Sequence, residues 1–125
     1  MKKTVIALGL SLGLSSFAFA APAKDAKAAA PDAGLVTVKG EVLDMACYLD
    51  HGAKGAEHAQ CAQTCIKSGL PVGLKADNGK TYLLIAEHTP VNQMLADYGG
   101  KTVTLRGKEA QRDGFNLLEN VELVK

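Results

Sequence analysis

The sequence predicts a mainly β domain of five strands and two short helices, with a cysteine-bearing helical segment between the first and second strands. Three observations support this prediction. Apolar and polar residues alternate in several short runs, which is the period-two pattern of half-buried strands. Asn-Gly and Asp-Gly pairs, which are typical of hairpin turns, separate neighbouring runs. All three cysteines lie in one stretch that follows the first run.

The N-terminal segment, residues 1–20, has the pattern of an export signal. Two lysines are followed by an apolar run from Val5 to Phe19, and a small-x-small cleavage motif ends at Ala20. The run is short for a stable membrane span, so we expect cleavage and no span afterwards. An uncleaved anchor is the alternative. The pattern predicts a periplasmic or secreted protein.

Residues 21–34 are rich in alanine, proline, aspartate and lysine, which predicts a flexible tether. Residues 35–125 are enough for one small domain and too few for two. The signal contains two of the 14 basic residues and none of the 13 acidic ones, so the mature chain would carry 12 against 13 and a net charge of −1. This balance, with aromatic residues at 5% of the chain, argues against a nucleic-acid partner.

The first strand is predicted where Val36, Val38 and Val42 share one face. Gly40 lies on the same face and indicates a bulge or a bend. The cysteine segment that follows contains a predicted helix over residues 57–68, which Gly69 would end.

The next two strands form a predicted hairpin around Asn78-Gly79, which suits a two-residue turn. That register places Leu74 opposite Leu83 on one face of the ribbon and leaves Tyr82 on the other face.

The second helix is predicted after the hairpin, with Thr89 as its N-cap, Pro90 as its first residue and Gly99 at its end. Its apolar stripe consists of Val91, Met94, Leu95 and Tyr98.

Two last strands are predicted on either side of a turn at Asp113-Gly114. A bulge is expected at Leu117-Leu118 in the second of them. The residues of this strand that share parity are Phe115, Leu117, Val121 and Leu123.

Apart from the cysteine segment, this element order is that of a five-stranded OB-type barrel. Over residues 35–125 the chain resembles small exported bacterial OB-fold proteins in size, signal and element order. The resemblance implies an OB-like barrel with the cysteine insertion at a connection that borders the usual ligand-binding face of the fold. Residues 40–49 and 58–66 also resemble a cysteine-rich block of uncharacterised exported bacterial proteins, which implies no activity.

Cys47, His58, Cys61 and Cys65 have the types and number of ligands of a Cys₃His metal site. On a regular helix with about 100° per residue, His58, Cys61 and Cys65 would lie within about 60° of one another. Cys47, from a different element, would supply the fourth ligand. Thiolate and imidazole are ligands that Zn²⁺ and Cu(I) favour. The sequence therefore predicts a binding module for copper or zinc.

Two other interpretations of the cysteines stay open. A disulfide between Cys47 and either Cys61 or Cys65 has equal weight, and it would give a stapled module that binds a small ligand or an envelope protein. A thiol-redox role has less support, because there is no Cys-x-x-Cys motif and Cys65 lies near the C-terminal end of the predicted helix, where the helix dipole disfavours thiolate. No catalytic motif stands out.

Three neighbours of the predicted ligands have other interpretations. His51 could replace His58, since it lies in a segment predicted to be a loop. Asp44 and Tyr48 are interpreted as residues at the edge of the core or as hydrogen-bond partners of the ligands, and not as ligands.

Overall fold

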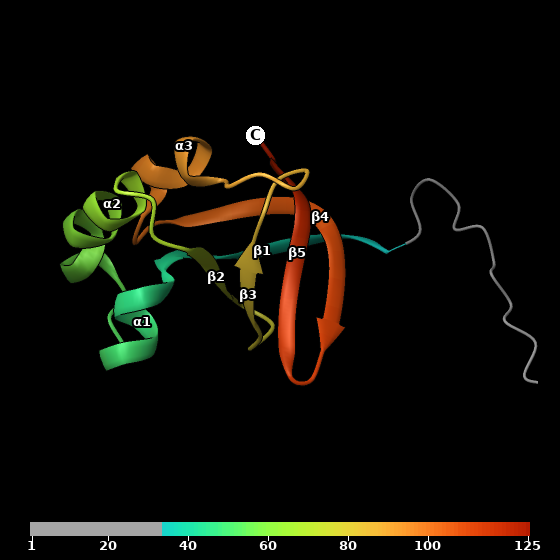
Figure 1. Ribbon diagram of the computed structural model, residues 1–125, viewed down its shortest axis with the longest axis horizontal. Helices are drawn as coiled ribbons and strands as arrows, with labels where there is room; N and C mark the ends of the chain where they lie inside the picture. The colour runs from blue at the N-terminus through green and yellow to red at the C-terminus, as the bar shows by residue number, and fades with distance from the viewer. Residues whose placement is uncertain (1–33) are drawn as a thin grey trace, which may run out of the picture.

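The computed structural model describes residues 34–125, so the predicted signal and the predicted tether up to residue 33 lie outside the described residues. Figure 1 shows a barrel of five strands with the labelled helices gathered at one end. The elements in chain order are β1 (Leu35–Asp44), α1 (Met45–His51), the 3-10 helix η1 (Ala56–His58), α2 (Ala59–Lys67), β2 (Val72–Ala76), β3 (Thr81–Leu84), α3 (Asn92–Leu95), the 3-10 helix η2 (Ala96–Tyr98), β4 (Thr102–Arg112) and β5 (Phe115–Leu123).

The strands close in the order β1-β2-β3-β5-β4, and β4 pairs back onto β1. Strands β3 and β5 are parallel, and the other neighbours are antiparallel. This topology confirms the predicted fold class, a mainly β, OB-like five-stranded barrel with a cysteine-bearing helical insertion between β1 and β2. The insertion therefore has a rigid sheet behind it.

The insertion holds one helix more than the sequence predicted. Helix α1 begins after Asp44, whose side chain accepts a hydrogen bond from the Ala46 N–H at 3.0 Å, and it ends at Gly52 in the left-handed conformation (φ 72°). None of its residues is fully buried. Apolar periodicity therefore gives no signal for α1, and its two caps are what define it.

Strand β1 is shared by two neighbours, which accounts for Gly40. Its N-terminal part pairs with β4 and its C-terminal part with β2, and Gly40 has a partner in both. A Cβ atom at Gly40 would lie 2.4 Å from the Lys75 carbonyl oxygen. The predicted bend at Gly40 is thus a close approach of two backbones that only glycine allows.

The core fills the barrel and extends under the helices. Ile66 of α2 and Leu95 of α3 are fully buried and belong to the same cluster as the strand residues. The strand residues of this cluster are Val38, Val42, Val72, Leu74, Ala76, Tyr82, Leu84, Val103, Leu105, Leu118 and Val121. Because α2 shares this core, its position relative to β1 is fixed by packing.

The predicted register of the β2–β3 hairpin is wrong by one residue. Leu74 pairs with Tyr82, and Leu83 is 41% exposed while Tyr82 is buried. The Gly79 N–H donates to the Ala76 carbonyl oxygen and Gly79 has φ 89°, so the loop has three residues and not two. The extra loop residue moves the β3 side chains to opposite faces.

The β4–β5 hairpin has the predicted turn but a different buried face. Asp113 and Gly114 have φ values of 50° and 85°, as in a two-residue type I′ turn. Phe115 is 81% exposed, and the buried residues of β5 are Leu118 and Val121. The bulge is not at Leu117-Leu118. The register shifts by one residue nearer the C-terminal end of β5, where Asn120 has a φ of 55°. This shift reverses which residues of β5 point into the core.

Helix α3 begins later than predicted, at Asn92. Val91 is the N-cap residue and no side chain caps the helix, so Thr89 is not its cap. Thr89 lies in the preceding loop, where its carbonyl accepts a hydrogen bond from the Ala86 N–H. The Asn92 side chain instead donates to the carbonyls of Ile66 and Leu70, at 2.8 and 2.7 Å. These bonds satisfy carbonyls at the C-terminal end of α2 and help to hold that helix in place.

Candidate metal centre

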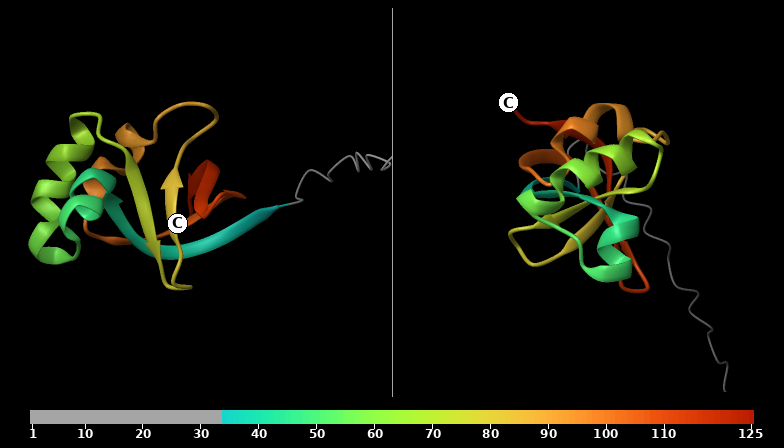
Figure 2. Two further views of the ribbon diagram at one scale, coloured as in Figure 1. Left: turned by 60° about the horizontal axis from the view of Figure 1, so that its bottom comes forward. Right: turned by 90° about the vertical axis from the view of Figure 1, so that its left-hand side faces the viewer.

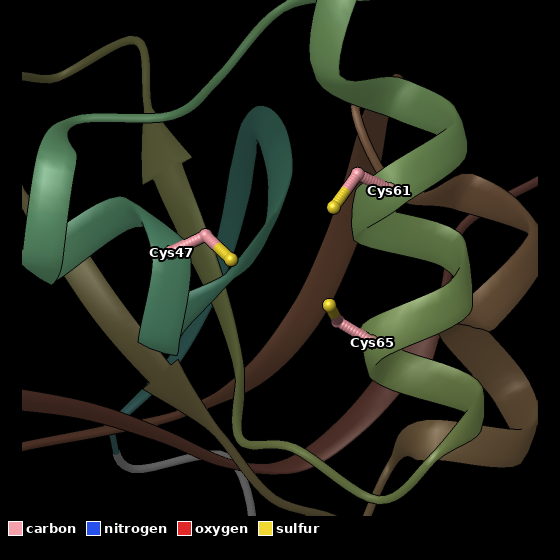
Figure 3. Close-up of side chains that lie close together, drawn as sticks. All are labelled: Cys47, Cys61 and Cys65. Carbon is pink, nitrogen blue, oxygen red and sulfur yellow. The ribbon is translucent and has the colours of Figure 1, made fainter.

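The three cysteines come from two helices of the insertion. Cys47 lies in the first turn of α1, and Cys61 and Cys65 lie one turn apart on α2. Seen from the helical end of the barrel, α1 and α2 lie side by side in front of the strands (Figure 2, right). Figure 3 shows the three thiol groups pointing toward one another across the gap between the helices.

The three sulfur atoms lie within 4.8 Å of one another. Sulfur ligands at about 2.3 Å from a tetrahedral ion are separated by roughly 3.8 Å, so a side-chain adjustment of about 1 Å or less would bring all three to one ion. The structure thus brings together the three predicted cysteine ligands. All three thiols are free, and no disulfide joins any two of them.

Helix α2 is held in place by the face next to the one that carries Cys61 and Cys65, since each buried residue directly follows a cysteine. Ala62 and Ile66 are buried there. Two glycines after η2 allow close contact with α2. A Cβ atom at Gly99 would lie 2.8 Å from the Gln63 nitrogen, and a Cβ atom at Gly100 would lie 2.6 Å from the Ala59 Cα. The positions of Cys61 and Cys65 therefore follow from packing against the barrel.

Asp44 is a site residue that sequence reasoning assigned to a supporting role. It is 1% exposed, and one carboxylate oxygen, Oδ1, accepts from the Ala46 N–H, while Oδ2 is buried without a hydrogen-bond partner. Asp44, Cys47 and His58 offer ligand atoms that lie within 4.8 Å of one another. Asp44 is also the N-cap of α1, and an N-cap signal before Met45 could have located this helix and with it the position of Asp44.

His58 lies beside Cys47 but not in one group with Cys61 and Cys65. Residues 56–58 form the 3-10 helix η1, so the regular α-helical spacing from which one shared face was predicted does not extend back to His58. Its Nε2 atom is buried and has no hydrogen-bond partner. The ring of His51 is 6.2 Å from that of His58, and its Nδ1 contacts the exposed Asp50 at 3.2 Å.

We call Asp44, Cys47, His58, Cys61 and Cys65 the cysteine cluster. Burial raises the pKa of Asp44, but the Cys47 thiol, the Ala46 N–H and the Cys65 thiol outweigh burial and hold that pKa below its ordinary value. The Cys47 and Cys65 thiols stabilise the carboxylate charge, although neither satisfies Oδ2.

The same contacts act on the thiols in the opposite direction. The hydrogen bond to Asp44, followed by burial and by the charge of Asp44, raises the pKa of Cys47 to about 12. Burial, followed by hydrogen bonds to Asp44 and Cys61, raises the pKa of Cys65. Without a metal, the cluster therefore holds a carboxylate beside protonated thiols at Cys47 and Cys65 near neutral pH.

No protein-family model matches this chain, and no curated protein or solved structure matches it either. Within residues 34–125, none of the helices is long and apolar enough to cross a membrane. The chemistry of the site therefore has to be inferred from its donor atoms: three thiols, one carboxylate and one imidazole.

Proposed function

We propose that this protein is a periplasmic or secreted binding module whose cysteine cluster holds a copper or zinc ion through Cys47, Cys61 and Cys65. The observation that carries the proposal is the convergence of three sulfur atoms, from two separately anchored helices, within 4.8 Å of one another. Thiolates are the ligands that Cu(I) and Zn²⁺ share. A rigid barrel behind two helices is a support that keeps such a site ready to bind.

The choice between the two metals depends on the remaining donors. The Asp44 carboxylate and the His58 imidazole, both beside Cys47, are donors of the kind that Zn²⁺ accepts together with thiolates. Three thiolates without further ligands are sufficient for the softer Cu(I). Both metals displace the thiol protons on binding, because the thiolate is the ligand.

The predicted compartment adds a second reason. Thiols in the bacterial envelope tend to oxidise unless a metal or a reductant protects them. The proximity of the three sulfurs that favours a metal also favours a disulfide from Cys47 to Cys61 or Cys65, and this is the competing function, a stapled module that binds a small ligand or an envelope protein. Thiol exchange is less favoured, because the raised pKa values of Cys47 and Cys65 disfavour a thiolate nucleophile.

The decisive experiment is elemental analysis with thiol counting on the full chain, expressed with its N-terminal segment and purified without chelators or oxygen. We expect at least one equivalent of copper or zinc and three thiols that react only after a chelator is added. Cys65→Ser should lose the metal, whereas Thr64→Ala, at the neighbouring exposed position of α2, should keep it. One reactive thiol and no metal would instead support the disulfide-stapled module.

A further inference from the structure

We propose that the cysteine cluster has two cation positions that share the sulfur of Cys47. One position lies among Cys47, Cys61 and Cys65, and the other among Asp44, Cys47 and His58. This inference rests on the proposed function and extends it, because it makes the site a thiolate-bridged pair with a stoichiometry of two.

The geometry divides the five donors into two overlapping sets. In each set the three donor atoms lie within 4.8 Å of one another, and Cys47 is the member that both sets contain. A thiolate sulfur has more than one lone pair and can bind an ion on each side. Two ions in one site typically lie about 3.5–4 Å apart, a separation that a single bridging sulfur with bonds of about 2.3 Å can span.

The second set contains two buried polar atoms that have no hydrogen-bond partner, Asp44 Oδ2 and His58 Nε2. Asp44 is 1% exposed, and both residues line the same small cleft beside β1. A buried acceptor without a partner costs on the order of 1–3 kcal/mol, and more when it is charged. A cation that took Oδ2 and Nε2 as ligands would satisfy both atoms, whereas an ion at the three-cysteine position would satisfy neither.

The charge of the filled site also favours two cations. Three thiolates and the Asp44 carboxylate carry four negative charges, so one divalent ion would leave a net charge of −2 in a partly buried cluster. Lys54 and Glu41 also line the cleft beside Asp44, and because their charges are opposite they add no net charge to it. Uncompensated buried charge is strongly unfavourable, and a second divalent ion would neutralise it.

The test is the number of Zn²⁺ ions that the reduced full chain retains after gel filtration in the presence of a weak chelator. We expect two equivalents for the wild type and one for His58→Gln or Asp44→Asn, because each change removes a donor of the second position only. Asparagine is as good an N-cap as aspartate, so Asp44→Asn keeps the start of α1. His88→Gln, in the loop before α3, is the matched control and should retain two equivalents.

X-ray absorption on the zinc-loaded protein provides a second readout. A zinc–zinc distance of about 3.5–4 Å should be present in the wild type and absent in His58→Gln. One equivalent in the wild type, without a metal–metal distance, would overturn the second position and leave the proposed function intact. No retained zinc or copper in the wild type would refute the proposed function itself.

Discussion

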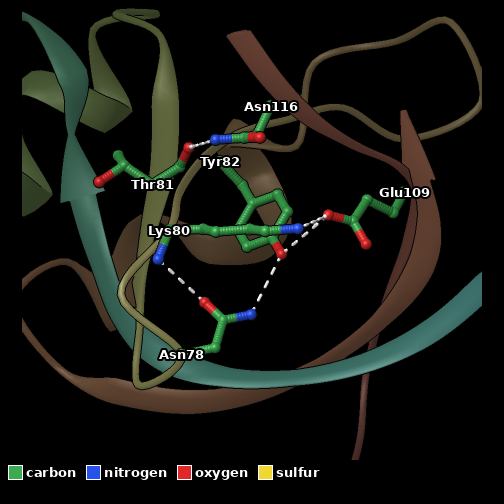
Figure 4. Close-up of polar contacts among 6 residues, drawn as sticks. All are labelled: Asn78, Lys80, Thr81, Tyr82, Glu109 and Asn116. Atoms are coloured by element: carbon green, nitrogen blue, oxygen red, sulfur yellow. Dashed lines mark hydrogen bonds and ion pairs between the residues drawn. The ribbon is translucent and has the colours of Figure 1, made fainter. Parts of the chain in front are cut away.

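Two polar clusters of this barrel differ in whether the polar atoms of each find their hydrogen-bond partners within the protein. The tyrosine cluster, formed by Asn78, Lys80, Tyr82 and Glu109, reaches from the β2–β3 hairpin to β4 (Figure 4). The buried Tyr82 hydroxyl donates to Glu109 and accepts from the Asn78 amide, both at 3.2 Å. Lys80 forms an ion pair with the same Glu109 carboxylate and lies 5.9 Å from the Tyr82 ring centroid.

Each charged group of the tyrosine cluster therefore faces its opposite, and the pKa values reflect this. The hydrogen bond from Lys80 is the main cause that holds the pKa of Glu109 below its ordinary value, and the hydrogen bond from the Tyr82 hydroxyl adds to it. Glu109 in turn raises the pKa of Lys80. In the cysteine cluster, the contacts of Asp44 are thiols and backbone N–H groups, and Oδ2 stays without a partner. The neighbouring Asn116 also leaves Oδ1 without a partner, but it is neutral and its amide donates to the Thr81 carbonyl.

The difference indicates which cluster needs something from outside the chain. A closed polar network stabilises the fold and specifies packing, whereas a buried carboxylate with one oxygen that has no hydrogen-bond partner is a position where a ligand can supply the missing partner. We therefore expect substitutions in the tyrosine cluster to change stability alone and substitutions in the cysteine cluster to change metal binding.

The largest expected effect is that of Cys47→Ser on metal binding. Cys47 belongs to both donor groups, so its loss should weaken zinc or copper binding by more than the roughly 10–100-fold that loss of an outer partner costs. Competition with a chromophoric chelator measures the change. Tyr82→Phe is the control and should bind metal with wild-type affinity. Unchanged binding by Cys47→Ser would eliminate Cys47 as a ligand.

The second effect concerns thiol reactivity in the metal-free protein. The hydrogen bond to Asp44, together with burial and the charge of Asp44, raises the pKa of Cys47 to about 12, so the thiolate is scarce at pH 8. Asp44→Asn removes the charge and weakens the hydrogen bond, and the pKa of Cys47 should fall toward its ordinary value. Each unit of decrease gives about tenfold more thiolate below the pKa, so we expect Cys47 to be alkylated about 10–100-fold faster.

Mass spectrometry after timed alkylation in a Cys61→Ser/Cys65→Ser background follows Cys47 alone. Asp50→Asn, an exposed aspartate on the same helix, is the control for a general effect of lost negative charge. Equal alkylation rates with and without Asp44 would show that the carboxylate does not control the Cys47 thiol.

The fold was predictable because its signals are local. Alternating valines define β1, and an Asn-Gly and an Asp-Gly pair mark the two hairpins. The order of the elements corresponds to one known barrel topology. The register of β3 was not predictable, because Asn78-Gly79 suits both a two-residue and a three-residue loop and the choice depends on which faces the closed barrel buries. The parity change at Asn120 likewise arises from pairing with β4.

The site was predictable in its cysteine and histidine donors, but not in Asp44 or in how the donors are grouped. The cysteines indicated thiolate chemistry, but their meeting depends on α1, a helix without a buried face. His58 was assigned to the face of Cys61 and Cys65 by α-helical spacing, which the 3-10 geometry of η1 breaks. Asp44 was interpreted as a residue at the core edge or a hydrogen-bond partner, because its place beside Cys47 and His58 depends on α1, which the sequence did not predict.

The third effect is the cost of opening the tyrosine cluster. Tyr82→Phe removes the buried hydroxyl that joins the exposed Asn78 to the half-buried Glu109. We expect a loss of about 1–2 kcal/mol in the free energy of unfolding, measured by urea denaturation. Tyr98→Phe, in η2, is the comparison for removing a hydroxyl elsewhere. A loss of metal affinity in Tyr82→Phe would contradict the separation of the two clusters.

The smallest effect is the pH dependence that Glu109 of the tyrosine cluster contributes to stability. The pKa of Glu109 is below its ordinary value in the folded protein, chiefly because Lys80 donates to it. A lowered pKa means that the ionised carboxylate stabilises the folded state above the unfolded-state pKa, near 4.5, and that this contribution disappears as the pH falls through the folded-state value.

Glu109→Gln should therefore be less stable than the wild type at pH 7, by less than Tyr82→Phe, because a partly exposed ion pair contributes little. The two proteins should become equally stable on acidification below the folded-state pKa of Glu109. Urea denaturation midpoints of metal-free wild type and variant at several pH values from 7 to below 4 measure the convergence. A gap that stays constant with pH would show that Glu109 acts through packing and not through its charge.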